Sequence, residues 1–181
     1  DDFSQVAFTR QVDGNRQALW VVNTDGSWLH RLFAETDFDR LTSDEGAATV
    51  PQQLDWVPGE DQLLMSTREI LIGPGQGIKE DLWLIDSGEP PVVVSLLNPG
   101  QGGEFKFSPN GRRVAFSTPE QIFITDQRDS TRIDLHTFSP LLTQSEWRYY
   151  PPLYWTLDSS ALRVPIPPEN LFPEPGELTK L

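Results

Sequence analysis

The chain is 181 residues long, contains no cysteine and carries a formal net charge of −13 at pH 7. The lack of thiols excludes disulfides, thiolate catalysis and zinc–thiolate sites, and a field of this sign disfavours nucleic acid and anionic lipid as partners. The mean hydropathy is −0.40, and no apolar run approaches the roughly 20 residues that cross a bilayer, so we expect no membrane insertion.

Short alternating segments at the start of the chain predict strands. Gln5–Arg10 is the first, and Leu19–Asn23 follows as a β-branched and aromatic run closed by a residue that can bond its own backbone. Residues 24–27 (Thr-Asp-Gly-Ser) form a predicted tight turn, after which Trp28–Leu32 is expected to continue as a strand. Helical periodicity nowhere extends beyond about one turn, so no helix is predicted.

A strand–turn–strand pattern then occurs three times without gaps. The copies start 51 and 48 residues apart, and each has an aromatic residue just before its turn. In the middle copy the turn Pro109-Asn110-Gly111-Arg112 combines a fixed φ with residues that tolerate positive φ, which indicates a tight hairpin. The copies are Leu54–Thr67 with Trp56, Phe105–Thr118 with Phe107, and Leu153–Ile166 with Trp155.

A second pattern, also in three copies, supplies further strands. These are the runs Leu19–Asn23, Leu82–Asp86 and Ile122–Asp126, followed respectively by Trp28–Leu32, Val92–Leu97 and Arg132–Phe138. Units of four strands that recur every 40–50 residues or so are typical of propeller blades.

The sequence therefore predicts an all-β fold of four-stranded antiparallel propeller blades, in one partial domain over residues 1–181. The first blade, about 3–42, lacks its inner strand. Two complete blades follow at about 52–97 and 103–139, and a partial fourth spans about 150–181. Because terminal repeats otherwise expose an apolar face, we expect roughly half of a longer propeller, completed by further blades or by another propeller fragment or chain.

Two segments resemble the WD40-like repeat of the TolB-type propeller family. The family pattern FSPDGxxIAF is met by residues 107–116 (FSPNGRRVAF), and IYVxNxDG is met by residues 19–26 (LWVVNTDG), with Arg31-Leu32 beyond. The resemblance extends over about residues 3–166 and is degenerate in the other copies. It implies a propeller that usually has six or more blades, a non-catalytic binding or scaffold role for a protein, peptide or other ligand, and an exported bacterial location in the periplasm, at the cell surface or outside the cell.

No cofactor or metal is expected, and no catalytic constellation is evident, so the chain is not expected to be an enzyme. The glycine-rich run 73–77 lacks the Lys-Ser/Thr of a phosphate-binding loop, and a blade loop explains it better. His30 and His136 are the only histidines, and both are interpreted as outer-strand surface residues. The acidic segments 37–39 and 44–45 lack calcium-loop spacing and are interpreted as solvated charge.

An aromatic cluster is the candidate partner-binding rim: Trp147, Arg148, Tyr149 and Tyr150. These residue types dominate binding hot spots. They lie between two blades, and the connection 68–81 should open on the same face of a propeller. The alternative is that the aromatic side chains cover the hydrophobic gap between blades, a packing role without a partner.

Two other functional classes stay open at this point. TolB-like blades also precede the catalytic domain of prolyl-oligopeptidase-type serine hydrolases, so the chain could be part of such a gating propeller. A Gly-x-Ser-x-Gly motif further along the parent chain would identify that class. A glycan-binding or lyase-like propeller is the weaker third alternative.

Overall fold

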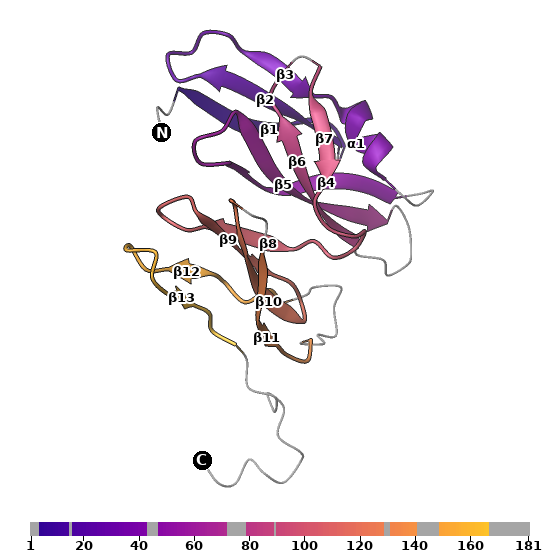
Figure 1. The fold of residues 1–181 in the computed structure, drawn as a ribbon. Coiled ribbons are helices and arrows are strands. Elements are labelled where there is room, and N and C mark those ends of the chain that lie inside the picture. The colour runs from indigo at the N-terminus through magenta and orange to yellow at the C-terminus, as the bar shows by residue number, and fades with distance from the viewer. Residues whose placement is uncertain are drawn as a thin grey trace, which may run out of the picture.

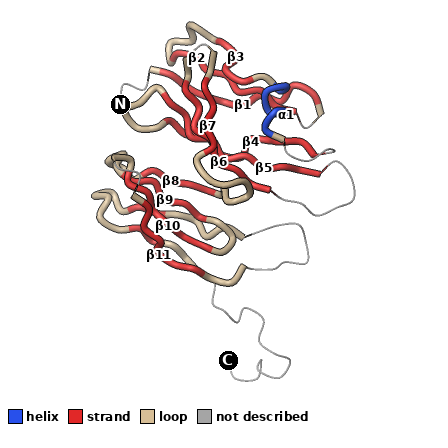
Figure 2. The backbone as a smooth tube through the Cα atoms, turned by 45° about the vertical axis from the view of Figure 1, so that its right-hand side comes forward, coloured by secondary structure: helices blue, strands red, loops and turns tan. Residues whose placement is uncertain are grey.

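The computed structural model describes residues 4–14, 16–42, 47–71, 79–88, 90–128, 131–140 and 149–166. Its strands form antiparallel sheets that follow one another along the molecule in chain order (Figure 1, Figure 2). Within each sheet, strands that are consecutive in the sequence are also neighbours in space. The all-β prediction and the prediction of four-stranded antiparallel sheets are therefore confirmed.

The first sheet has the order β1-β2-β3, with β1 at Gln5–Asp13, β2 at Arg16–Asn23 and β3 at His30–Phe33. The strand predicted from Trp28 begins two residues later, because Trp28 has a φ of 52° that extended backbone does not adopt. The preceding turn is held by the Asp25 carboxylate, which accepts the Ser27 hydroxyl at 2.6 Å and the Ser27 N–H at 2.8 Å. These bonds lower the pKa of Asp25.

A short helix, α1 (Glu35–Leu41), follows β3, and here the prediction of no helix is wrong. Its first turn is stabilised by the Asp37 carboxylate, which accepts the otherwise unpaired N–H of Ala34 at 2.8 Å. Its one fully buried side chain is Phe38, which meets Phe33 edge to face. Seven residues form only two turns, too few for a helical period to stand out in the sequence.

Two four-stranded sheets make up the middle of the molecule, with strand orders β4-β5-β6-β7 and β8-β9-β10-β11. A two-stranded pair, β12 and β13, follows them. The strands of the second sheet are β4 (Ala47–Trp56), β5 (Gln62–Leu71), β6 (Lys79–Asp86) and β7 (Val92–Ser95). Those of the third are β8 (Glu104–Phe107), β9 (Arg113–Ser117), β10 (Gln121–Asp126) and β11 (Arg132–Thr137), and the final pair is Tyr154–Trp155 with Leu162–Arg163.

The three predicted hairpins all form, and the later two share one turn geometry. Gly111 has a φ of 69°, and Ser159, at the matching position of the next copy, has a φ of 60°. Asn110 and Asp158 each accept the backbone N–H of the residue two positions later, in both cases at 3.1 Å. Hydrogen bonding, chiefly from the Thr156 hydroxyl, lowers the pKa of Asp158 to about 2.

Two hydrophobic cores lie between successive sheets. Because side chains alternate along a strand, β5 sends Leu63 and Met65 into one core and Leu64 into the other. The first core joins these two residues and Ile85 to Leu19, Val21, Leu32, Phe33 and Phe38. The second joins Val57, Leu64 and Leu82 to Phe105, Phe107, Val114, Phe116 and Phe123. The middle sheet is thus buried on both faces, as expected for one blade packed between two others.

The hairpin turns of successive sheets also touch. A Cβ atom built on Gly111 would lie 2.6 Å from the Pro58 side chain, so the third sheet's turn packs closely on the second's. The Ser159 hydroxyl accepts the N–H of Asn110 at 3.1 Å, which joins the turn of β12–β13 to that of β8–β9. This repeated turn-on-turn contact is consistent with part of a propeller. In the portion of the chain that the structure describes, no helix has the length and apolar character to cross a membrane.

Candidate functional site

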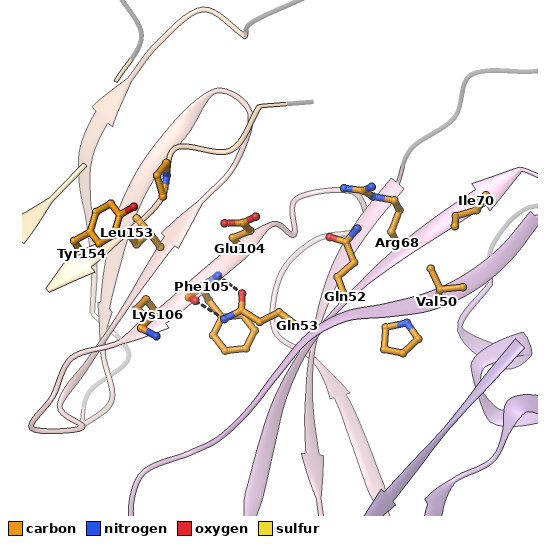
Figure 3. Close-up of a pocket in the computed structure, with 12 residues that line it drawn as sticks. Val50, Gln52, Gln53, Arg68, Ile70, Glu104, Phe105, Lys106, Leu153 and Tyr154 are labelled. Carbon is orange, nitrogen blue, oxygen red and sulfur yellow. Dashed lines mark hydrogen bonds between the residues drawn. The ribbon is translucent and has the colours of Figure 1, made fainter. Parts of the chain in front are cut away.

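A cavity of about 780 Å³ opens between the first strands of the second and third sheets (Figure 3). We call it the inter-sheet cavity. It is lined by residues 50–53 of β4, Arg68 and Ile70 of β5, residues 104–106 of β8, and residues 152–154 before and within β12. Its walls therefore come from three successive sheets, and this volume is within the range of cavities that bind small molecules.

Strand alternation decides which β8 side chains face this region. Phe105 and Phe107 are buried in the second core, whereas Glu104 and Lys106 are exposed on the opposite face of the strand. That opposite face is directed toward the segment that contains Tyr154 (Figure 3). The buried phenylalanines thus fix the positions from which the two charged side chains extend.

Arg68 is held in place by hydrogen bonds from its guanidinium. Its Nε and Nη2 atoms donate to Glu80 Oε1 at 3.1 and 2.9 Å, and the Glu80 side chain is only 3% exposed. The Gln52 amide oxygen, in the orientation that allows it to accept, lies 2.9 Å from Nη2. A buried carboxylate of this kind needs its partner, because a buried charge without one is strongly destabilising. Arg68 is therefore a rigid part of the cavity wall.

Glu104 lies between Arg68 and Tyr154 along the cavity (Figure 3). Although the side chain as a whole is exposed, its carboxyl group is partly shielded from water; this partial burial raises its pKa, an effect that the charge of Arg68 opposes. Asp55, close to Lys106, has a raised pKa for the same reason, opposed by a backbone hydrogen bond from Trp56 and by the charge of Lys106.

Hydrogen bonds from two side chains to the backbone of β8 join the strands around the cavity. The Gln53 side chain donates from Nε2 to the Phe105 carbonyl at 2.7 Å and accepts the Phe105 N–H at 3.1 Å (Figure 3). On the other side of β8, the Trp155 indole donates from Nε1 to the Lys106 carbonyl at 3.0 Å. The first strands of three successive sheets are thereby joined by side chain–backbone bonds.

The residues of the predicted aromatic rim directly precede the cavity-lining residues 152–154 in the sequence. Trp147 and Arg148 fall outside the described residues. The Tyr149 hydroxyl donates to the Pro165 carbonyl at 3.3 Å. Tyr150 is 9% exposed, and its buried hydroxyl has no hydrogen-bond partner within the described ranges. Neither tyrosine lines the cavity, but residues 152–154, which follow at once, do.

The predicted juxtaposition of the connection 68–81 with the aromatic rim stays a prediction, because residues 72–78, 147 and 148 lie outside the described residues. Arg68, at the start of the predicted connection 68–81, shares the cavity with residues 152–154. The polar residues that matter most here were not singled out from the sequence: Gln52, Arg68, Glu104, Lys106 and Tyr154. The available signal was the alternation of charged and aromatic residues in 104–107, which marks a strand with one polar face.

The other sequence candidates lie away from this cavity. His30 begins β3 and His136 lies in β11, both outermost strands of their sheets as expected. Asp37 caps α1, and Asp39 forms an ion pair with Arg16. Residues 44–45 and 73–77 lie outside the described residues. Among the residues that the structure does describe, no group of three or more His, Asp or Glu side chains is placed to hold a metal ion.

Comparison with known proteins gives one structural likeness to report. No family model matches the chain, and no curated protein matches it. Among solved structures, the chain is similar to TolB from Acinetobacter baumannii, with 14% sequence identity and a TM-score of 0.48 over 89% of this chain. The match covers 34% of the TolB chain, so this chain spans about a third of that protein's length.

Proposed function

We propose that this chain is a non-catalytic binding or scaffold module of the propeller type and that it binds a protein or peptide partner in the inter-sheet cavity. The observation that carries the proposal is the composition of the cavity wall. Three successive sheets contribute to it, and they are joined by the Gln53–Phe105 and Trp155–Lys106 hydrogen bonds. A wall built on strands rather than loops can hold recognition groups in fixed positions.

The groups on this wall are suited to recognition of a polypeptide. A guanidinium held by Glu80, an ammonium, a carboxyl group, amides and a phenol hydroxyl line the cavity, with the apolar side chains of Ile70 and Leu153 at its two ends (Figure 3). Polar groups fixed in position beside apolar surface are typical of binding sites. The proposal includes an exported location and the four-blade division of the chain, both of which remain predictions.

A matched pair of tryptophan substitutions tests the site. Ile70 lines the cavity and is 39% exposed, whereas Ile133 is 48% exposed on β11, the outermost strand of the third sheet. We expect Ile70→Trp to fill the cavity and to weaken by at least about tenfold the binding of peptides selected from a random displayed library against the wild-type chain. Ile133→Trp should leave that binding unchanged.

The proposal fails if no peptide is selected, or if the selected peptides bind the two variants equally well. The hydrolase alternative has no supporting observation in the described residues. It would replace the proposal if the full parent chain reacted with a fluorophosphonate probe at a serine beyond this region.

A further inference from the structure

The second inference rests on the proposed function and concerns the chemistry of the ligand. Five ionisable side chains lie in or next to the inter-sheet cavity: Arg68, Lys106, Asp55, Glu80 and Glu104. Arg68, Lys106 and Glu104 line the cavity itself, and the carboxylates of Glu80 and Asp55 lie beside the two cations, so the five groups together comprise three carboxylates and two cations. The whole chain adds a field of net charge −13, which attracts cations toward the site.

The two cations differ in how closely they are paired with anions. The Arg68 guanidinium is bonded to the buried carboxylate of Glu80 through two nitrogens. Lys106 interacts electrostatically with Asp55. The charge of Arg68 is therefore largely offset within the protein, whereas Lys106 forms no ion pair among the described residues and is influenced by Asp55 only through the electrostatic field.

Glu104 shares a burial-raised pKa with Asp55 and differs from both other carboxylates in its hydrogen bonding. Its burial disfavours the ionised form, and its electrostatic interaction with Arg68 compensates for this only in part. No hydrogen bond to its carboxyl group is present among the described residues, whereas Glu80 accepts two from Arg68. A half-buried carboxylate of this kind gains most from a cation that replaces its lost water.

An aromatic ring lies at the same end of the cavity. Tyr154 is 58% exposed, and it lines the cavity together with Leu153 and Glu104 (Figure 3). The face of an aromatic ring attracts ammonium and guanidinium groups, and Leu153 offers apolar surface to the methylene chain that carries them. A carboxylate, a ring and an aliphatic surface together fit one long basic side chain.

We propose that the Glu104 end of the inter-sheet cavity binds a lysine or arginine side chain of an extended peptide, with Glu104 as the ion-pair partner and Tyr154 as the aromatic contact.

Amino-acid amides test this proposal without knowledge of the natural partner. The probes are N-acetyl-lysine amide and N-acetyl-arginine amide, with N-acetyl-norleucine amide as the neutral analogue and N-acetyl-glutamate amide as the anionic one. Binding is followed by NMR through the Glu104 carboxyl carbon and the Trp155 indole N–H, which is bonded to the β8 backbone. We expect both basic probes to bind at least about tenfold more tightly than norleucine amide.

Two glutamate variants provide the matched comparison. Glu104→Gln should weaken binding of the basic probes by about tenfold, while Glu120→Gln, an exposed position in the β9–β10 turn, should not change it. Tyr154→Leu keeps an apolar side chain and should weaken binding by about two- to fivefold. The spectra of each variant away from the cavity show directly that it is folded.

The pH dependence of binding provides a third readout. Burial raises the pKa of Glu104. As the pH is lowered, Glu104 should therefore be protonated at a higher pH than an ordinary glutamate, and the affinity for the basic probes should begin to fall there. Asp55 has a raised pKa too, so the decisive comparison is with Glu104→Gln, in which this fall in affinity should disappear. Arg68 and Lys106 are the cationic side chains that line the cavity together with Glu104.

The proposal is overturned if norleucine amide binds as tightly as lysine amide, if glutamate amide is preferred, or if Glu120→Gln has the same effect as Glu104→Gln. These outcomes are separable from failure of the proposed function. If peptides sensitive to Ile70→Trp are selected but contain no lysine or arginine, the cavity is a binding site and only its cation preference is wrong.

Discussion

Glu104 illustrates at the scale of one residue how a binding group can oppose folding. Its carboxyl group is half-buried, and burial raises its pKa above the ordinary glutamate value. A raised pKa means that the folded chain favours the protonated form. The stability contributed by this group is therefore present at low pH and is lost as the pH rises through the pKa of the folded state.

The first prediction follows from the loss of stability that ionised Glu104 causes at neutral pH. At pH 7, Glu104→Gln should unfold at a higher urea concentration than the wild-type chain, because the glutamine cannot ionise. The gain is expected to be small, since the group is only half-buried and solvent screens its charge. The advantage should shrink as the pH falls to about 4, where wild-type Glu104 also becomes neutral.

Urea titrations at both pH values, with Glu120→Gln as control, check this prediction. A destabilised Glu104→Gln at pH 7 would mean that Arg68 stabilises the carboxylate by more than burial destabilises it. The same measurement also helps to interpret the ligand experiments, because a variant that loses binding while gaining stability has not lost binding by unfolding.

At the scale of elements, the contact between successive hairpin turns makes one turn glycine harder to replace than another. Gly59 and Gly111 both have positive φ, at 81° and 69°. A Cβ built on Gly59 would meet no atom within 4 Å, whereas one built on Gly111 would meet the Pro58 side chain at 2.6 Å. The two glycines therefore share a backbone requirement and differ in packing.

The second prediction uses that difference. Gly59→Ala should destabilise the chain by about 1–2 kcal/mol, through the strain of a side chain at positive φ. Gly111→Ala should carry the same strain and lose about 1–3 kcal/mol more, because the turn of the third sheet must move away from Pro58. Denaturant midpoints of the two variants measure the difference. Equal losses would show that the turns do not support each other across the sheets.

The hairpins could be predicted from sequence because their determinants are local. Pro109, Asn110 and Gly111 specify a turn within a few residues, and the structure confirms it together with its two relatives. The helix α1 was missed because its stability comes from the burial of Phe38 and from one cap, neither of which produces a long periodic pattern.

The cavity could not be predicted from sequence because its residues meet only after three sheets have packed. Gln53 bonds to Phe105, 52 positions further along the chain, and Trp155 bonds to Lys106 across 49 positions. Sequence patterns gave the strands and their polar faces. They did not give the relative register of neighbouring sheets, which decides that Glu104 rather than Lys106 lies between Arg68 and Tyr154.

At the scale of the whole molecule, apolar side chains are exposed on the first strand of the first sheet and on the outermost strand of the third sheet, which is followed only by the short β12–β13 pair. On β1, Ala7 packs against the first core, so Val6, Phe8 and Val12 point away from it and are exposed. On β11, Arg132 lies over the ring of the buried Phe123, so Ile133 and Leu135 point to the other side and are exposed. A terminal repeat with such a face calls for a neighbour.

The N-terminal end also has an unsatisfied hydrogen-bond donor. Trp56 occupies the same place in its hairpin as Trp155, whose indole donates to the first strand of the preceding sheet. The first sheet has three strands among the described residues, and the buried Trp56 Nε1 has no partner within them. An acceptor from one further strand at this end would complete the same contact, which fits the expectation that further blades or another chain complete the ring.

The third prediction concerns these two ends. The isolated 181-residue chain should self-associate in a head-to-tail manner as its concentration rises, because the exposed face on β1 can pack on that of β11 in the next copy. Light scattering should show a mass that increases with concentration. It should also increase with salt, which screens the repulsion between chains of net charge −13.

Each end should matter equally in such an association, because every contact joins one β1 face to one β11 face. Phe8→Lys and Leu135→Lys should therefore each reduce the mass to that of the monomer. Val94→Lys, at a comparably exposed position on β7 of the middle sheet, should not. A wild-type chain that stays monomeric at every concentration would show that these faces do not drive association. If all three lysine substitutions had equal effects, the association would be non-specific. A loss confined to the β1 and β11 faces would identify them as surfaces that can pack against another sheet.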